Sequence, residues 1–326
     1  IYFLGADIGS LTTKIVLIDR EGVLLYSSYR RNEAGPIETI RQAFAVMKNL
    51  PVNPVAAGTT GSGRHLAAVM IEADTVVNEI TAHALAARTV EPEVRTVIDI
   101  GGQDSKIIYL KDGVSIGFNM NTVCAAGTGS FLDHQAARLN IPIEEFGDYA
   151  LRSANPVAIA GRCGVFAESD LIHKQQLGYC REDLIAGLCL ALAKNYLTNV
   201  ARNRKVEPVV LFQGGVAANS GIRWALEKLL GEKLVIPEHY KVMGAYGAAL
   251  LARQRYLEGA VKQSAFRGIS SVAESDYRPR GFICSGCGNS CEISELHIAG
   301  KRAGRWGSRC GKWEADLRES EPQQVP

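Results

Sequence analysis

The sequence has no apolar run long enough to span a membrane, and no signal-like segment precedes its first expected strand. It also has no excess of one charge, since 36 Lys and Arg stand against 34 Asp and Glu, a net charge of +2. These absences give no reason to expect a membrane or a nucleic acid as partner. Eight cysteines without a secretory signal indicate a reducing cytoplasm, where thiols are more often metal ligands or buried residues than disulfides. We therefore predict a globular cytoplasmic protein.

Two similar turns stand out, GADIGSLTTK at residues 5–14 and IDIGGQDSK at residues 98–106. Each follows an apolar strand that delivers an aspartate to its tip, Asp7 or Asp99. Such a turn offers backbone N–H groups and hydroxyls to phosphate oxygens, and a carboxylate to a hydrated metal ion. A single Asp-x-Gly commonly just closes a tight hairpin. The repetition, with a lysine at a similar offset, favours two turns that hold one nucleotide.

A third turn lies in VVLFQGGVAAN, residues 209–219, where an apolar strand opens into Gly-Gly before a helix. Paired glycines let the backbone approach a base or ribose without a Cβ in the way. The order phosphate, phosphate, adenosine resembles the superfamily of actin, heat-shock ATPases and sugar kinases. That resemblance implies an α/β fold of two lobes, which are duplicates of one ribonuclease H-like unit.

The apolar periodicity agrees with such an alternation of strands and helices. We expect strands at residues 2–6, 14–19, 23–29, 96–100, 105–110 and 114–119, and helices at 37–47, 79–89, 181–203 and 243–258. We expect five parts: a first lobe at 1–93 completed by 237–258, a second lobe at 94–236, a linker at 259–280, a Cys-rich metal-binding module at 281–318 and a polar tail at 319–326.

Cys124 and Cys163 occur in NTVCAAGTGSFLD and AIAGRCGVFAESDLI, each just before a small-residue turn and an expected helix start. A thiolate at a helix N-terminus is stabilised by unpaired N–H groups and the helix dipole. Two thiolates cannot fill a four-coordinate site, but a symmetric dimer would bring four around one iron–sulfur cluster. The alternative is a pair of ordinary buried cysteines beside tight turns.

The segments DIGGQDSK, NTVCAAGTGSFLD, CGVFAESDLI, QGGVAAN and GAYGAALLA occur in this order. Together they resemble the activators of 2-hydroxyacyl-CoA dehydratases and the ATPase components of benzoyl-CoA reductase, over about residues 2–258. The resemblance implies a homodimer in which Cys124 and Cys163 of both chains bridge one four-iron four-sulfur (4Fe-4S) cluster. It further implies that ATP hydrolysis drives an electron, received from a donor such as ferredoxin or flavodoxin, into a partner iron–sulfur enzyme.

Resemblance and chemistry together assign the nucleotide site. Asp7 and Asp99 would hold the Mg²⁺ shell or orient the attacking water. The residues expected to contact ATP or ADP come from all three turns: Gly9, Ser10, Thr12, Thr13 and Lys14; Gly101, Gly102, Gln103 and Asp104; and, near the adenosine, Gly214, Gly215 and Asn219. Gly127 and Gly129 would approach either the phosphates or the cluster.

The C-terminal Cys284, Cys287, Cys291 and Cys310 form C-x2-C-x3-C-x18-C. Four cysteines in a short polar module indicate a bound metal, either Zn²⁺ or a second iron–sulfur cluster. An activator of this type would end near the helix at 243–258, so the module is a departure from the family. Cys180 and Cys189 are expected in the core.

The leading functional hypothesis is an ATP-hydrolysing activator that passes one low-potential electron to an iron–sulfur dehydratase or reductase, such as a double-cubane cluster protein. Two alternatives use the same nucleotide site. One is a small-molecule kinase, for which no further carboxylate stands out as catalytic base. The other is a zinc-bearing, ATP-dependent regulatory module without redox activity.

Overall fold

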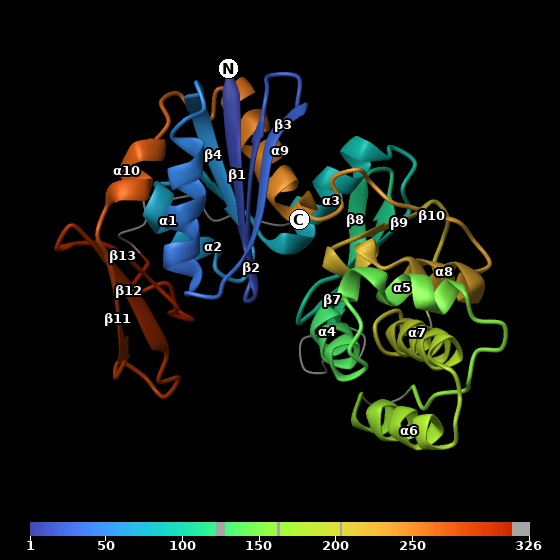
Figure 1. Ribbon diagram of the computed structural model, residues 1–326. Coiled ribbons are helices and arrows are strands. Elements are labelled where there is room, and N and C mark those ends of the chain that lie inside the picture. The colour runs from blue at the N-terminus through green and yellow to red at the C-terminus, as the bar shows by residue number, and fades with distance from the viewer. Residues whose placement is uncertain (122–127, 162–163, 203, 315–326) are drawn as a thin grey trace. The chain divides into compact units, whose positions relative to one another are not determined.

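The computed structural model describes residues 1–121, 128–161, 164–202 and 204–314 (Figure 1). The chain divides into two units. Unit 1 comprises Ile1–Ala82 and Gly244–Pro326, and unit 2 comprises His83–Met243. Among the described residues, no helix is both long and apolar enough to cross a lipid bilayer.

Unit 1 contains a five-stranded sheet in the order β3-β2-β1-β4-β5. Its strands are β1 (Tyr2–Ile8), β2 (Thr12–Ile18), β3 (Leu24–Arg31), β4 (Pro54–Thr60) and β5 (Thr75–Val76). β1 pairs antiparallel with β2 and parallel with β4. β1 is buried along nearly its whole length, which explains its continuous apolar sequence, whereas β3 alternates between half-buried and exposed residues.

Helices cover both faces of this sheet. They are α1 (Pro36–Met47), α2 (Arg64–Ile71) and α9 (Met243–Leu257). Leu4, Ala6 and Ile8 join one core with side chains of α1 and α2. On the other face α9 lies so close to the strands that a Cβ on Gly5 would overlap Ala245 O, and one on Gly58 would overlap Ala248 O. Small residues on β1, β4 and α9 are therefore what permits this packing.

The C-terminal part of the chain packs into unit 1. It comprises α10 (Ile269–Glu274) and an antiparallel sheet of β11 (Tyr277–Ile283), β12 (Glu292–Ile298) and β13 (Lys301–Trp306). Tyr277 and Leu296 are buried in the core that contains β1, and α10 contacts α1. Residues 259–280, expected as a linker, thus include a packed helix. Their polar composition concealed the few apolar side chains, such as Val272, that anchor them.

Unit 2 repeats the topology of unit 1, with strand order β10-β9-β6-β7-β8. Its strands are β6 (Thr96–Ile100), β7 (Ser105–Lys111), β8 (Val114–Asn121), β9 (Val210–Gln213) and β10 (Leu234–Val235). As in unit 1, the central strand β6 pairs antiparallel with the next strand, β7, and parallel with β9. The two sheets are therefore duplicates, strand for strand.

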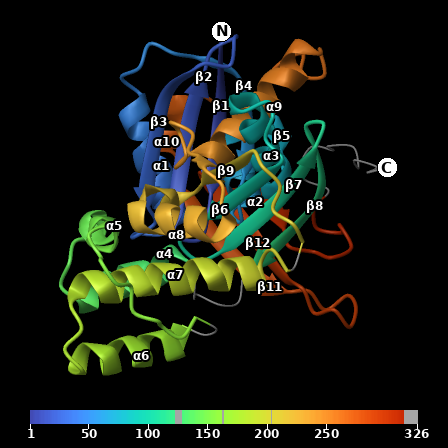
Figure 2. The same cartoon turned by 90° about the vertical axis from the view of Figure 1, so that its right-hand side faces the viewer.

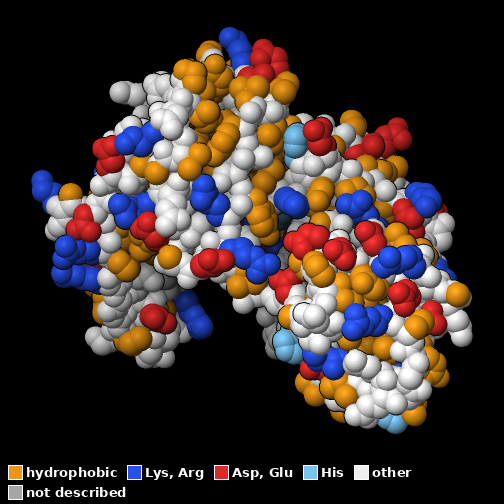
Figure 3. Space-filling view, viewed as in Figure 1, with side chains coloured by type: hydrophobic (Ala, Val, Ile, Leu, Met, Phe, Trp, Pro, Cys, Tyr) orange, Lys and Arg blue, Asp and Glu red, His pale blue; other side chains and the backbone are white. Residues whose placement is uncertain are grey.

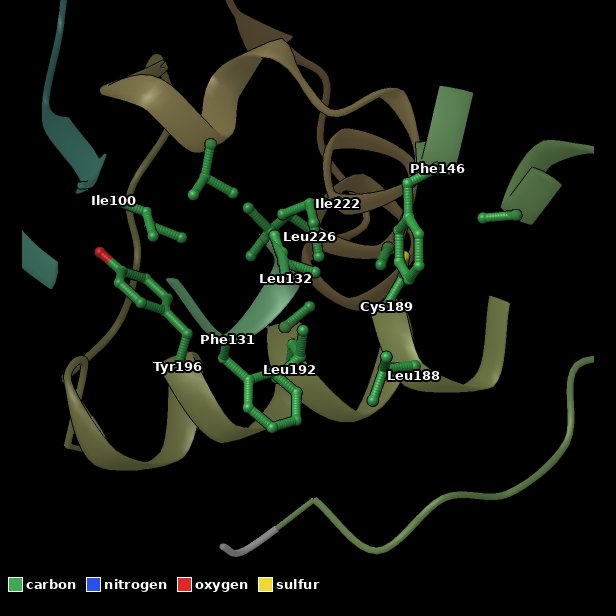
Figure 4. Close-up of a cluster of buried hydrophobic side chains, with 14 of the residues drawn as sticks. Ile100, Phe131, Leu132, Phe146, Leu188, Cys189, Leu192, Tyr196, Ile222 and Leu226 are labelled. Carbon is green, nitrogen blue, oxygen red and sulfur yellow. The ribbon is translucent and has the colours of Figure 1, made fainter. Parts of the chain in front are cut away.

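The helices of unit 2 are α3 (Glu79–Val90, from His83 on), α4 (Gly129–Arg138), α5 (Ile143–Leu151), α6 (Gly164–Gln176), α7 (Arg181–Asn199), the 3₁₀ helix η1 (Gly215–Ala218) and α8 (Ser220–Leu230). Of these, α5, α6 and α8 pack against α7, which Figure 2 shows alongside α6. Leu188, Leu192 and Tyr196 of α7 pack with Phe131, Phe146 and Leu226 in its core (Figure 4).

Of the two cysteines expected in the core, only Cys189 lies there. Burial raises the pKa of the Cys189 thiol to about 12. Cys180 is exposed, so the prediction for it was wrong. It occupies the N-cap position of α7, outside the part of the helix that packs.

The unit boundaries differ from the lobe boundaries expected at residues 93 and 237. Residues 83–93 belong to unit 2, where Arg88 Nη1 donates to Gly113 O. Residues 237–243 also belong to unit 2, because Gly214 N donates to Tyr240 O. Tertiary hydrogen bonds of this kind leave no pattern in the sequence.

We predict that Gly5→Ala lowers the free energy of unfolding by about 3 kcal/mol, because the added Cβ would overlap the backbone of α9 rather than a movable side chain. Urea unfolding followed by circular dichroism measures this. Gly281→Ala is the control, since a Cβ there meets its nearest atom, Ile293 O, at 3.5 Å; it should change stability by less than about 0.5 kcal/mol. Equal midpoints for both variants would contradict the prediction.

Candidate functional site

The first aspartate turn, in unit 1, is closed by a buried ion pair. Asp7 lies opposite Lys14 in the register of β1 and β2, and Lys14 Nζ lies 3.0 Å from Asp7 Oδ2. Asp7 is only 5% exposed. Gly9 N donates to Thr12 O at 2.9 Å and completes the turn. The carboxylate is therefore held beside the turn, with its charge balanced.

Asn32, which the sequence analysis did not single out, supports this turn. Its Nδ2 donates to Gly9 O at 2.9 Å, and its Oδ1 accepts from the Thr13 hydroxyl at 2.7 Å. Thr13 is buried, whereas Ser10 is exposed. Of the hydroxyls expected to contact phosphate, that of Ser10 is thus accessible, while that of Thr13 holds the loop together.

The second aspartate turn, in unit 2, has the same construction. Asp99 lies opposite Lys106 in the register of β6 and β7, and Lys106 Nζ lies 3.5 Å from Asp99 Oδ2 and 2.9 Å from Asp104 Oδ2. Gly101 N donates to Asp104 O at 2.9 Å. Asp99 and Lys106 are 4% and 3% exposed, so this ion pair is buried as well.

A glycine lies against each aspartate, just past the neighbouring parallel strand. Asp7 is level with Thr60 of β4, and Asp99 with Gln213 of β9. The next residues, Gly61 and Gly214, have φ of +94° and +89°; an added Cβ would lie 2.6 Å from Asp7 Oδ1 and 2.9 Å from Asp99 Oδ1 respectively. Both positions need glycine for its conformation and for the space that the carboxylate takes.

The structure therefore places Gly214 beside Asp99. Gly215 begins η1, and Asn219 caps α8, its Oδ1 accepting from Ile222 N at 3.0 Å. The register also shows that residues 56–64 occupy in unit 1 the position that 209–219 occupy in unit 2. The sequence analysis missed this equivalence. The only feature that the two segments share in sequence is a strand followed by glycines.

A buried polar cluster surrounds Asp99. His83 of α3 is 7% exposed, and its Nε2 lies 3.8 Å from Asp99 Oδ2. Gln213 is fully buried, with its Nε2 at 2.6 Å from His83 Nδ1. Tyr196 OH donates to Lys106 O at 2.6 Å, and burial, together with the nearby Asp99 charge, raises the pKa of Tyr196 well above its usual value. His83 and Gln213 were not among the predicted site residues.

The N-terminus of α4 is hydrogen-bonded to the second turn. Gly129 N donates to Gly101 O at 2.9 Å, and both the N–H and the hydroxyl of Ser130 donate to Gly102 O, at 2.8 and 2.6 Å. A Cβ on Gly129 would lie 3.2 Å from Gly101 O. Residues 122–127, which include the predicted Cys124 and Gly127, directly precede this point and lie outside the described residues.

Cys163, the other predicted cluster ligand, also lies outside the described residues, but both of its flanks are described. Before it, Gly161 O accepts from Asn195 Nδ2 at 2.6 Å, and Ala160 N donates to Asp170 Oδ2 at 2.9 Å. After it, α6 approaches α4, since His134 Nδ1 lies 3.8 Å from Glu168 Oε2.

The C-terminal cysteines lie on and beyond the β11–β12 hairpin. Cys284 N donates to Cys291 O at 2.8 Å, and Cys284 Sγ accepts from Trp313 Nε1 at 3.2 Å and from Gly286 N at 3.5 Å. These two donors lower the pKa of the Cys284 thiol. Cys287 and Cys310 are exposed. Within the described ranges, no three His, Cys, Asp or Glu side chains gather so as to hold a metal ion, so the expected four-cysteine site is not assembled here.

Two duplicated α/β units, each with an aspartate turn, define the fold of the actin, heat-shock ATPase and sugar-kinase class, as predicted. The model of the BadF/BadG/BcrA/BcrD ATPase family matches residues 4–252, and the chain belongs to that family. The resemblance noted in the sequence is thereby confirmed. β11–β13 lie beyond the matched residues.

Curated relatives agree with this assignment. The chain is 36% identical to the (R)-2-hydroxyglutaryl-CoA dehydratase activating ATPase of Acidaminococcus fermentans, over 78% of this chain and 98% of that protein. It is 34% identical to the activator of lactoyl-CoA dehydratase of Anaerotignum propionicum, over 77% of this chain and 97% of that protein.

Among solved structures, the activator of the 2-hydroxyisocaproyl-CoA dehydratase from Clostridium difficile with bound ADPNP is similar. It matches with a TM-score of 0.73 and 32% identity, over 80% of this chain and 98% of that chain.

We predict that Gly61→Ala and Gly214→Ala each lower ATP turnover about tenfold or more, because the new Cβ would overlap the carbonyl oxygen of Ile8 or Ile100 and crowd the neighbouring aspartate. Phosphate release is measured below the unfolding temperature of every variant. The matched control is Gly231→Ala, at φ +72° with no atom within 4 Å of its Cβ. Its φ is positive as well, but with ψ at 14° it lies in the left-handed region, whereas ψ at Gly214 is 173°. Alanine at Gly231 therefore costs about 1 kcal/mol, and that variant should turn over ATP like wild type. Equal losses in all three variants would mean that strain alone is responsible.

Proposed function

We propose that this protein is an ATP-hydrolysing activator that donates one low-potential electron to an iron–sulfur dehydratase or reductase. The electron comes from a 4Fe-4S cluster held by Cys124 and Cys163 of two copies of the chain. Membership of an ATPase family and relatives named as activators of acyl-CoA dehydratases support the ATP-dependent part. An upstream donor of the ferredoxin or flavodoxin class supplies the electron.

The observation that carries the proposal is the contact of α4 with the second aspartate turn. Gly101 O and Gly102 O accept from the first residues of α4, Gly129 and Ser130. If this turn binds the phosphates of ATP, hydrolysis of ATP and release of phosphate move the two carbonyl groups that accept these hydrogen bonds. The helix start then moves with them, and the chain leading back to Cys124 moves too.

The position of α6 supports a common site for the two cysteines. Glu168 of α6 and His134 of α4 form a link, so the helices that follow Cys124 and Cys163 lie close together. Ala160, which precedes Cys163 in the sequence, donates from its N–H to Asp170 of α6. Two thiolates in one region of each chain are what a cluster shared by two chains requires.

The surface of α6 supports a homodimer. Val165 and Phe166, directly after Cys163, are 70% and 66% exposed, and Leu177 at the far end is 63% exposed. In Figure 3 hydrophobic side chains border the end of unit 2 where Figure 1 draws α6. A second copy brought close by a shared cluster would cover this apolar surface.

Each aspartate turn offers partners for Mg²⁺ and phosphate. Both have a carboxylate with a charge-balancing lysine, and the first adds the exposed hydroxyl of Ser10. Thr60 Oγ1 and Gln213 Oε1, level with the two aspartates, are buried and have no hydrogen-bond partner among the described residues. Asp7 and Asp99 would hold the metal shell or orient the attacking water.

The four C-terminal cysteines are proposed as a second metal site, for Zn²⁺ or a further cluster. Their spacing supports it, as do the hairpin bond between Cys284 and Cys291 and the N–H donors on Cys284 Sγ. Since the four thiols are not gathered in this structure, metal binding requires them to come closer together.

We predict that anaerobically prepared wild type contains about four core iron atoms per two chains, and that Cys124→Ser and Cys163→Ser each lose them. Iron and sulfide analysis, with the visible spectrum before and after dithionite, measures this. Cys180→Ser, at an exposed cysteine, is the control and should keep the iron.

Both core variants should still bind MgATP, because neither cysteine belongs to an aspartate turn. Full core iron in either variant would refute the cluster assignment. Cys284→Ser should lose only the zinc or iron of the C-terminal site, and unchanged metal content in that variant would refute the second site.

We further predict that Ser130→Ala weakens the coupling of nucleotide to cluster. The ratio of iron-chelation rates with MgATP and with MgADP should fall about fivefold, the equivalent of one hydrogen bond of about 1 kcal/mol. Ser275→Ala is the control, since that hydroxyl donates to Ser271 O at the end of α10. A Ser130→Ala ratio equal to that of wild type would show that α4 does not transmit the nucleotide state.

A further inference from the structure

Asp99 is held by groups from three separate elements. Lys106 of β7 approaches its Oδ2 at 3.5 Å, and His83 of α3 approaches the same oxygen at 3.8 Å. Its Oδ1 lies against Gly214, which follows β9. The carboxylate therefore has one oxygen facing two cationic or donor groups and the other confined by the backbone, which defines its orientation.

Gln213 determines which nitrogen of His83 carries the proton. Its Nε2 lies 2.6 Å from His83 Nδ1, and an amide nitrogen can only donate. Nδ1 therefore accepts, and the neutral imidazole carries its proton on Nε2, the atom that faces Asp99. The Nε2 to Oδ2 distance of 3.8 Å is longer than a direct hydrogen bond. Contacts of this length around a site tighten when ligand binds, or are bridged by a water.

The second polar atom of the Gln213 side chain, Oε1, has no hydrogen-bond partner among the described residues. Gln213 is fully buried, and within the described part of the chain its Oε1 makes no hydrogen bond. A buried acceptor of this kind is normally satisfied by an internal water or a ligand. The cluster of His83, Gln213 and Asp99 thus has more hydrogen-bonding capacity than the protein itself uses.

The equivalent position in unit 1 does not have this arrangement. Thr60, level with Asp7, stands where Gln213 stands beside Asp99. A threonine hydroxyl lies one bond from Cβ, whereas the amide of glutamine reaches two bonds further. The two aspartate turns are duplicated, but the His–Gln pair belongs to the turn of unit 2.

We propose that His83, held by Gln213, is a positioning residue for ATP hydrolysis. It donates from Nε2 toward Asp99 Oδ2 and so keeps the carboxylate in the orientation that acts on Mg²⁺ or on the attacking water. This inference rests on the proposed ATP-hydrolysing function and adds two residues to it. The role is one of orientation, so its loss affects turnover more than nucleotide binding.

The test is the steady-state hydrolysis of MgATP by the full-length protein. His83→Ala should lower kcat about 10- to 100-fold and change KM for ATP by less than about threefold, as expected when an interaction needed in the transition state is removed. His83→Gln, whose amide can donate from a position similar to Nε2, should recover part of kcat. Gln213→Leu should resemble His83→Ala. The control is Thr89→Ala, at the exposed end of the same helix. We expect this variant to have the kcat of wild type.

Each other outcome overturns the inference in a recognisable way. A kcat of wild-type size in His83→Ala refutes it while leaving ATP hydrolysis intact. A raised KM with unchanged kcat assigns His83 to binding instead. Equal kcat in His83→Gln and His83→Ala refutes the donor role, and His83→Gln with Gln213→Leu decides the matter if His83→Ala does not fold. Absence of hydrolysis in wild type refutes the proposed function itself.

Discussion

The site depends on a buried carboxylate that is neutralised by the strand next to it. Removing Asp7 or Asp99 from water is costly unless a counter-charge comes with it. The antiparallel register supplies that charge, because it places Lys14 and Lys106 directly opposite. The neighbouring parallel strand ends in a glycine that leaves room for the carboxylate. Sheet topology therefore specifies the ion pair, and the ion pair lies at the base of the turn.

The second aspartate turn also holds the start of α4. The first N–H groups of a helix have no partner within the helix. In α4, the N–H groups of Gly129 and Ser130 donate to the carbonyl oxygens of Gly101 and Gly102 in the turn. Each bond contributes about 1 kcal/mol, enough to make the start of the helix follow the turn and too little to lock it. A coupling device needs both properties: a bond strong enough to transmit a change and weak enough to be reset.

The fold was largely predictable, and the surroundings of the site were not. The strand at Thr96–Ile100 coincides with the expected one because burial on both faces produces an unbroken apolar run. Asn32 and His83 carry no local signal, since their roles arise from partners far along the chain. The equivalence of residues 56–64 with 209–219 is visible only in strand register. The spacing of the C-terminal cysteines predicts a metal site, but it does not reveal that Cys287 and Cys310 are exposed and that the four thiols are not gathered in this structure.

Duplication also explains why the two turns need not do the same work. Both units inherit the aspartate, the lysine and the glycine, which are the groups that the topology demands. They differ at Thr60 and Gln213. Both side chains are buried, and the strand pairing does not restrict the residue type at this position further. In unit 2 the longer side chain reaches His83, and the same turn also receives the start of α4. The groups next to Asp99 and the first residues of α4 thus meet at one turn, so a change in the hydrogen bonds of that turn acts directly on the start of the helix.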